Sequence, residues 1–252
     1  MARHFGSGVL WGTPTQDALG NAVANPTPFQ FGIMQDVGID ASFDEKLLYG
    51  QNSFPVDSGR GKGKIGLKAK FANINILPMT AAFFGLPAVD GLVTTVNDLV
   101  GHAIPTEGEI TITPPGSTTF FANLGVRSDA TGTPMIRVAA SPKTGEYTTD
   151  GQGKYTFATA DKDKVVFIDY QHMNSAAGKL LTVRNLPMGL NPTFRVDFAM
   201  ARNGKVLTLT WPNVTSSKLA MSTKQEDFII PELDMSCMAD DSGVVWKWSS
   251  SE

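Results

Sequence analysis

The chain has 252 residues and a formal net charge of −3, with 42% hydrophobic and 18% charged residues. This composition is ordinary for a globular protein, and its slightly acidic balance argues against a generic nucleic-acid-binding protein, which would carry excess lysine and arginine. No apolar run is long enough to cross a membrane and no secretory signal is recognisable, while the single cysteine excludes an internal disulfide framework.

Residues 1–28 mix glycine, proline, asparagine and threonine with scattered apolar residues, and no period is sustained. We therefore expect an extended arm or loop, which would span about 90 Å if fully stretched at about 3.3 Å per residue. Phe5, Leu10 and Trp11 would be unusual side chains to leave in water. This favours an arm that lies on a neighbouring molecule over a frayed terminus.

From Phe29 to Phe43 the chain alternates between apolar and polar residues, which predicts a β-strand with one acidic face. The apolar residues share one parity, and the other parity carries Asp36, Asp40 and Asp44. Residues 45–60, which follow, are expected to form a long loop.

The sequence SGRGKGKIGLKAK, from residue 58 to residue 70, is the most basic stretch of the chain. Its glycines match the letters of a dinucleotide-binding fingerprint, but that motif requires a helix after them. Here the residues alternate instead, and the positions between the apolar ones carry Lys62, Lys64, Lys68 and Lys70. We predict a basic-faced strand that pairs with the acidic one, so that neighbouring acids neutralise the lysines at about 0.2–1 kcal/mol per pair.

Residues 75–84 are the best helix candidate and are expected to form a short α-helix. Asn75 can cap its start, and Gly85 can supply the left-handed residue after its end. The apolar residues expected to pack on the sheet include Ile76, Phe83 and Phe84.

Residues 104–174 contain short β-rich runs separated by turn sequences such as PPG, ATGTP and DGQG. This spacing is typical of a small sandwich or barrel. We therefore predict an inserted β domain at 104–174 within a main domain made of residues 1–103 and 175–252.

The C-terminal part contains a strong hairpin signal, Asn203-Gly204, which is typical of a type I′ turn. Numbering outward from this turn predicts the apolar pairs Met200–Leu207, Phe198–Leu209 and Val196–Trp211. A later strand is predicted where Leu233, Met235 and Cys237 alternate with polar residues that include Glu232 and Asp234.

Motifs that carry chemistry are not recognisable. His4, His102 and His172 lie far apart and lack partners at metal or triad spacing, although a triad assembled from distant residues stays open. Cys237 falls on the apolar parity of its strand, which favours a buried inert thiol over a nucleophile. We expect no enzyme, and no catalytic residue, metal site or cofactor.

The expected fold is all-β: a β-sandwich or half-barrel with one short α-helix and an inserted small β domain. Strands with one apolar and one charged face would leave long edges exposed in a monomer, and exposed edges invite pairing. Head-to-tail association of identical chains covers such edges and closes into a ring when the rotation permits.

Most of the chain resembles the tail tube (major tail) proteins of long-tailed bacteriophages. The stretches that carry the resemblance are DVGIDASFDEKLLYGQNSFPVDSGRGKGKIGLKAKFANINILPMTAAFFG, TGEYTTDGQGKYTFATADKDKVVFIDYQ, RNLPMGLNPTFRVDFAMARNGKVLTLTW and EDFIIPELDMSCMADDSGVVWKW. The resemblance implies hexameric rings that stack into a hollow tube and conduct double-stranded DNA without binding it specifically. It also implies a helix at 75–84 outside the tube, and contacts of loop 45–60 and the N-terminal arm with the next ring.

The partners that this resemblance implies are further copies of the chain, a tape measure protein inside the tube and a tail terminator at its end, with no membrane. The implied location is the virion, as part of a siphovirus tail assembled in the host cytoplasm. A lumen lined by unpaired lysines would retain a polyanion such as DNA. The lumen or inter-ring candidates are therefore Asp36, Asp40, Asp44, Glu232 and Asp234, with Lys62, Lys64, Lys68 and Lys70 neutralised beside them.

Two alternative functions remain at this point. One is another phage structural component, such as a tail terminator, which forms rings that do not polymerise. The other is a receptor- or carbohydrate-binding β adhesin, which would need exposed aromatic residues. Trp11, Trp211, Trp246 and Trp248 mostly fall on the core parity of their segments, which argues against an adhesin.

Overall fold

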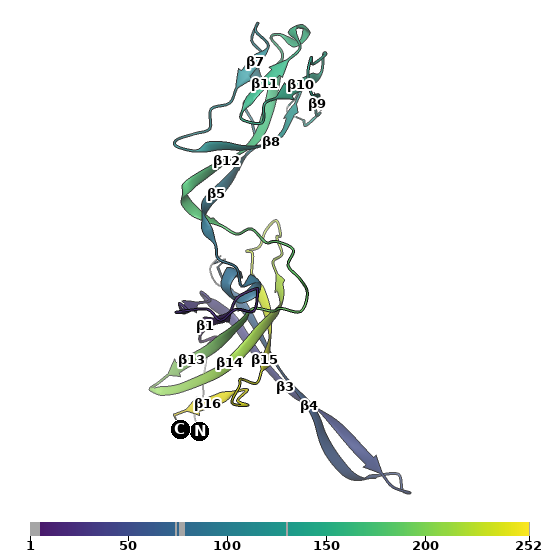
Figure 1. The fold of residues 1–252 in the computed structure, drawn as a ribbon, viewed down its shortest axis with the longest axis vertical. Helices are drawn as coiled ribbons and strands as arrows, with labels where there is room; N and C mark the ends of the chain where they lie inside the picture. Colours follow the sequence, from purple (N-terminus) through teal and green to yellow (C-terminus); the bar gives the residue numbers. More distant parts are fainter. Residues whose placement is uncertain (1–5, 74, 76–78, 130, 252) are drawn as a thin grey trace. The chain divides into compact units, whose positions relative to one another are not determined.

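The computed structural model describes residues 6–73, 75, 79–129 and 131–251, and it is nearly all β, as predicted. The chain divides into two compact units, unit 1 (Met1–Ala88 with Leu181–Glu252) and unit 2 (Val89–Leu180) (Figure 1). Unit 2 contains the insert predicted at 104–174 but begins earlier and ends later. The reason is that its first strand, β5 (Val89–Val96), pairs with the end of its last, β12 (Val165–Leu180).

Unit 1 is built on one eight-stranded sheet in the order β2–β1–β13–β14–β15–β4–β3, with β16 paired to β14 outside this path. Its strands are β1 (Val9–Gln16), β2 (Phe29–Gln30), β3 (Met34–Tyr49), β4 (Pro55–Phe71), β13 (Thr193–Arg202), β14 (Lys205–Ala220), β15 (Glu232–Met238) and β16 (Lys247–Ser250).

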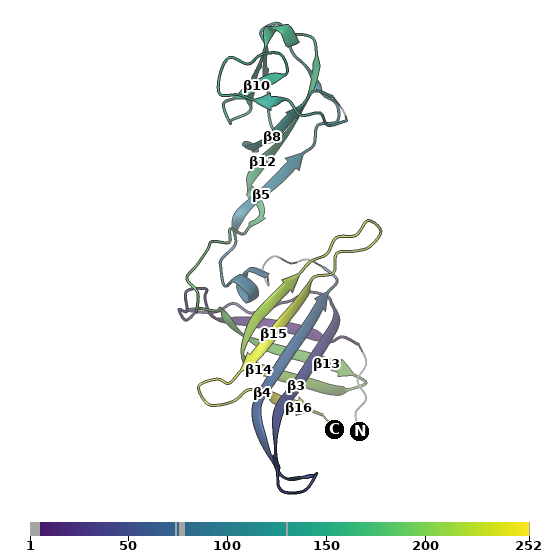
Figure 2. The same cartoon turned by 90° about the vertical axis from the view of Figure 1, so that its right-hand side faces the viewer.

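This sheet folds over on itself along β14. The first half of β14 pairs with β13 and β16, and its second half pairs with β15. Figure 2 shows the resulting layers, with β3, β4 and β15 crossing in front of β1 and β13. The predicted all-β sandwich is confirmed.

Side chains from both layers form the core of unit 1. They include Leu10 of β1, Leu67 and Phe71 of β4, Phe194 and Val196 of β13, Trp211 of β14 and Leu233 of β15. The alternation predicted for β4 is confirmed, since its last apolar residues are buried while Lys62, Lys64, Lys68 and Lys70 are exposed. The glycine-rich stretch is a strand and has no helix after its glycines.

The predicted N-terminal arm is wrong for residues 9–16, which form β1 and pair with β13. Leu10 is fully buried, and the next inward position is Gly12. A Cβ at Gly12 would lie 2.7 Å from the Phe29 ring and 2.8 Å from the Phe31 ring. Because aromatic rings from β2 and the residue after it cover this glycine, the strand shows no apolar alternation.

The predicted loop at 45–60 is also wrong, because most of it continues β3 and β4 as a hairpin. The two strands pair from Met34–Phe71 to Tyr49–Pro55, and only residues 50–54 form the turn. Three glycines of β4, Gly59, Gly61 and Gly63, occupy positions where a periodic strand would carry apolar residues. Because of these glycines, the sequence shows no apolar alternation over this part of the strand, and the strand was not predicted.

A break at Gly32 separates β2 from β3. Gly32 has a φ of 112° and turns the chain, so that Met34 is buried and Ile33 is exposed. The strand predicted from Phe29 to Phe43 is therefore interrupted. Met34 points inward, a bulge follows it, and Val37 packs on the core with the predicted parity.

Where an α-helix was predicted at 75–84, the described residues form a π-helix, η1 (Met79–Phe84). Ala82 is buried in the core of unit 1 and Phe83 packs against it, while Phe84 contacts Phe83 edge to face. Gly85 has a φ of 59°, as expected for the residue after a helix. Ile76, the third residue expected to pack on the sheet, lies outside the described residues.

The hairpin predicted at Asn203-Gly204 is confirmed. Both turn residues have positive φ, 49° and 75°. The register between β13 and β14 contains the three predicted pairs, Met200–Leu207, Phe198–Leu209 and Val196–Trp211.

Unit 2 has two four-stranded sheets, β7–β11–β10–β9 and β5–β12–β6 with β8 on β12. Besides β5 and β12, its elements are β6 (His102–Ala103), β7 (Glu109–Thr111), β8 (Thr119–Arg127), β9 (Ile136–Arg137), β10 (Glu146–Thr149), β11 (Lys154–Phe157) and η2 (Thr159–Asp161). Its own core includes Ile104, Val126, Tyr155, Val166 and Ile168.

Candidate assembly surface

The outward face of β3, β4 and β15 carries rows of opposite charge. In the register of these strands, Lys70 lies between Asp36 and Glu232. The next row places Lys68 between Gly38 and Asp234. The predicted pairing of an acidic strand with the basic strand is therefore observed, and β15 adds acids on the other side.

These rows bring charges close without short ion pairs. Among the described residues no ion pair involves any of Lys62, Lys64, Lys68 or Lys70, and Asp234 instead lies 4.0 Å from Lys218 of β14. A cavity of about 520 Å³ opens over Gly38 and Gly66 and is lined by Asp40, Lys64, Lys68 and Asp234. The arrangement places opposite charges beside one another without the direct contact of an ion pair.

Of the remaining predicted site residues, Asp40 lies opposite Gly66 on the sheet face, and the other three lie where the hairpin begins to extend beyond β15. Lys64 faces Ser42 across the hairpin, and Asp44 lies in a bulge after Phe43. Lys62 is exposed nearby. Sequence reasoning therefore grouped residues that the structure divides between the sheet face and this projecting part.

We call residues 43–63 the ribbon, because there β3 and β4 pair only with each other; β15 pairs with β4 no further than Ile65. Both strands of the ribbon are exposed, as Figures 1 and 2 show for the hairpin that projects from unit 1. Its exposed apolar residues are Phe43, Leu47, Leu48, Tyr49, Phe54 and Val56. Most of these apolar residues stand in the sequence LLYGQNSFPV, but their role could not be recognised because the segment was predicted to be a loop.

The ribbon also has an unpaired edge. β3 is the last strand of its sheet and is sixteen residues long, whereas the opposite edge strand, β2, has two residues. A long edge strand presents a row of backbone donors and acceptors that another chain can pair with. The guanidinium carbon of Arg60 lies 4.1 Å from the centre of the Phe43 ring and stabilises the ribbon from within.

The histidines belong to no group that could hold a metal ion among the described residues. His102 does have a partner that spacing did not reveal, since its Nε2 lies 3.4 Å from Asp98 Oδ2. Asp98 already accepts hydrogen bonds from the amides of Val100, Gly101 and Ile168, which indicates a structural role. His172 is buried, and His4 lies outside the described residues.

Cys237 of β15 is half-buried and packs against the core of unit 1. Burial raises the pKa of its thiol to about 12. A thiol with such a pKa is almost entirely protonated at neutral pH and is a poor nucleophile.

The tryptophans are more exposed than their parity predicted. Trp211 is fully buried and stacks on Trp246, but Trp248 is 64% exposed and Trp11 is 43% exposed. Trp248 stacks on Trp246 at the edge strand β16. The expectation failed for Trp248 because it lies on β16, a short strand that pairs with β14 outside the main path of the sheet, and its side chain stays largely exposed.

No helix in the described part of the chain has the length and apolar character needed to cross a membrane. Comparison with known proteins gives no further assignment, because the chain matches no protein-family model and no curated protein.

Proposed function

We propose that the protein is the structural subunit of a bacteriophage tail tube, in which six copies form a ring and the rings stack into a conduit for DNA. The observation that carries this proposal is the ribbon. A two-stranded ribbon is marginally stable alone in water, and this one exposes apolar side chains together with a long free edge. Contact with further copies would bury the apolar residues and pair the edge.

The charged face of β3, β4 and β15 supports the proposal. Each phosphate neutralised by a fixed lysine steepens the salt dependence of DNA binding by about 0.9 in log K per log of salt. Rows such as Asp36–Lys70–Glu232 balance lysine with acid. A bore lined by such rows would let DNA slide without holding it. A tape measure protein inside the tube and a terminator at its end belong to the same proposal.

A second candidate, a carbohydrate-binding adhesin, has one observation in its favour. Trp248 is exposed and stacked on Trp246, and such an aromatic face can bind a sugar ring. The charged rows and the apolar ribbon have no role in that function, so we rank it second.

Electron microscopy of the purified full chain at increasing concentration tests the proposal. We expect hollow tubes with a regular axial repeat. Isolated rings that never polymerise would indicate a tail terminator instead. Monomers at every concentration, combined with binding to a glycan array, would contradict the tube proposal and favour the adhesin.

A further inference from the structure

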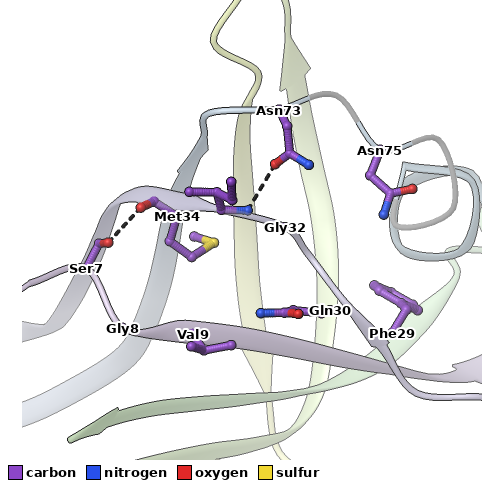
Figure 3. Close-up of a pocket in the computed structure, with 10 residues that line it drawn as sticks. Ser7, Gly8, Val9, Phe29, Gln30, Gly32, Met34, Asn73 and Asn75 are labelled. Atoms are coloured by element: carbon purple, nitrogen blue, oxygen red, sulfur yellow. Dashed lines mark hydrogen bonds between the residues drawn. The ribbon is translucent and has the colours of Figure 1, made fainter.

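A cavity of about 700 Å³ lies beside the start of β3 in unit 1 (Figure 3). We call it the base cavity. It opens because β2 pairs with β1 only through Phe29 and Gln30, and the last backbone bond between the two segments runs from Phe31 N to Leu10 O. On the side where β2 ends, Val9 therefore borders the cavity, while on its other side it pairs with Ala199 of β13.

Two hydrogen bonds between segments that are distant in the sequence hold the wall of this cavity in place. The side-chain oxygen of Asn73 accepts a hydrogen bond from Ile33 N at 2.9 Å, and Ser7 Oγ donates one to Met34 O at 2.6 Å. Figure 3 shows both bonds. A Cβ on Gly32 would lie 2.5 Å from Asn73 Oδ1, so the glycine is required for this wall.

Among the described residues that line it, the base cavity has no charged side chain, and it combines apolar groups with carboxamides. Phe29, Ile33 and Met34 supply apolar surface, while Gln30 and Asn73 supply amide donors and acceptors. The turn of the ribbon, GQNSF at 50–54, has the same character. It has two carboxamides, no charge, and a Phe54 side chain that is 81% exposed.

The cavity and this turn belong to opposite ends of one hairpin. Met34 and Phe71 pair beside the cavity, and Tyr49 and Pro55 pair beside the turn. At about 3.3 Å per residue the hairpin spans about 50 Å, so the turn cannot reach the cavity of its own chain. A turn that enters the cavity of a second copy leaves that copy's turn free for a third, which is the head-to-tail contact that builds open stacks.

On the basis of the proposed function, we propose that the base cavity receives the 50–54 turn of the ribbon from a copy in the adjacent ring. Phe54 would pack against Phe29 and Ile33. The carboxamides of Gln51 and Asn52 would bond with Gln30 or Asn73. The partner is therefore a second copy of this chain, bound through an uncharged contact that is insensitive to salt.

Disulfide cross-linking tests this contact. In a Cys237→Ser background, Asn52→Cys is combined with Gln30→Cys, and each cysteine is also introduced alone. After mild oxidation we expect the double variant to give a ladder of multimers in denaturing gels, and each single variant to stay monomeric. An equimolar mixture of the two single variants should give one dimer band.

The outcomes separate this inference from the tube proposal. Regular tubes without a cross-linked ladder would show that the turn binds elsewhere, and would overturn the inference alone. A ladder without tubes would support the contact and overturn the tube. Phe54→Asp provides a second measurement. It should raise the protein concentration needed for assembly at least tenfold while tryptophan-detected unfolding stays unchanged, and normal assembly of this variant would overturn the inference.

Discussion

Glycine fixes the backbone of unit 1 at a point where no side chain fits. Gly85 ends η1 with a φ of 59°, and a Cβ there would lie 2.5 Å from Pro192 Cβ and 2.7 Å from Ala18 N. Its carbonyl oxygen accepts a hydrogen bond from Ala18 N at 3.2 Å. The close approach of η1 to the segment after β1 therefore depends on this residue.

We expect Gly85→Ala to lower the free energy of unfolding of unit 1 by about 2–4 kcal/mol, because left-handed strain costs about 1–2 kcal/mol and the clash adds to it. Urea unfolding followed by tryptophan fluorescence measures this, since all four tryptophans lie in unit 1. Gly243→Ala is the control. Gly243 has a φ of 78° with open space around it, and should cost only about 1 kcal/mol. Equal losses would contradict the predicted clash.

Asp98 fixes the backbone of unit 2 through hydrogen bonds. Its carboxylate accepts hydrogen bonds from three backbone amides, and its own amide donates to Asp169, which Arg127 holds through two further bonds. Burial acts to raise the pKa of Asp98, but the amide hydrogen bonds outweigh it and lower that pKa below 3.8. The carboxylate therefore stabilises unit 2 above the ordinary aspartate pKa, and this contribution is lost as the pH falls through the lowered value.

Asp98→Asn should therefore destabilise unit 2 at pH 7, by about 1–3 kcal/mol, and should flatten its loss of stability below pH 4. Hydrogen exchange of residues 89–180 across pH 7 to 2.5, corrected for intrinsic exchange rates, measures both effects. A remaining slope is expected from Asp161, whose pKa is also lowered by hydrogen bonds from Lys164 and Gly145 against the effect of burial. An unchanged pH profile in the variant would contradict this role for Asp98.

At the scale of elements, the charged rows predict that the contribution of an exposed lysine to stability depends on which residues lie opposite it in the register. Lys70 lies between two acids, so Lys70→Glu places three carboxylates in one row. We expect a loss of about 1–2 kcal/mol at low salt that shrinks in 0.5 M NaCl, because these pairs are exposed and screened. Lys64→Glu, opposite Ser42, should change stability by less than about 0.5 kcal/mol. Similar losses for both variants would contradict the row model.

The ribbon should matter for assembly and not for the stability of one copy. Leu48 is exposed, so Leu48→Asp should leave the unfolding free energy within about 0.5 kcal/mol of the parent. The same change should shift sedimentation from assemblies toward monomers. Met188→Asp replaces another exposed apolar residue of unit 1, outside the ribbon, and is the matched control. If the Leu48→Asp variant assembles as well as the parent protein, the ribbon is not a contact surface.

The sequence predicted elements well where alternation and turn chemistry agreed. The hairpin at Asn203-Gly204 and the buried residues of β4 followed from periods of two. Prediction failed where glycine replaced an apolar residue, as at Gly12 in β1 and at Gly59 and Gly61 in the ribbon. At these positions the backbone pairs with a neighbouring strand, but the side chains show no apolar alternation that would indicate a strand. The base cavity could not be predicted, since it depends on the turn at Gly32 and on contacts between distant segments.

At the scale of the whole molecule, the chain carries two hydrophobic cores with no shared buried residue among those described. Val89 and Leu180 are register partners in an antiparallel pair, so the ends of unit 2 lie within about 5.5 Å of each other. A unit with adjacent ends can be inserted into a surface connection without opening the core of its host. The ribbon, the charged rows and the base cavity all belong to unit 1.

Replacing residues 89–180 with a short Gly-Ser linker should therefore leave unit 1 folded and able to assemble. We expect its tryptophan-detected unfolding midpoint to match that of the parent, and tubes of the same axial repeat to form in electron micrographs. The control carries the same linker between Ala88 and Val89 in the full chain, which alters the connection but keeps unit 2. If the control assembles and the deletion variant folds but stays monomeric, unit 2 must supply an assembly contact, and the assignment of that role to unit 1 alone is wrong.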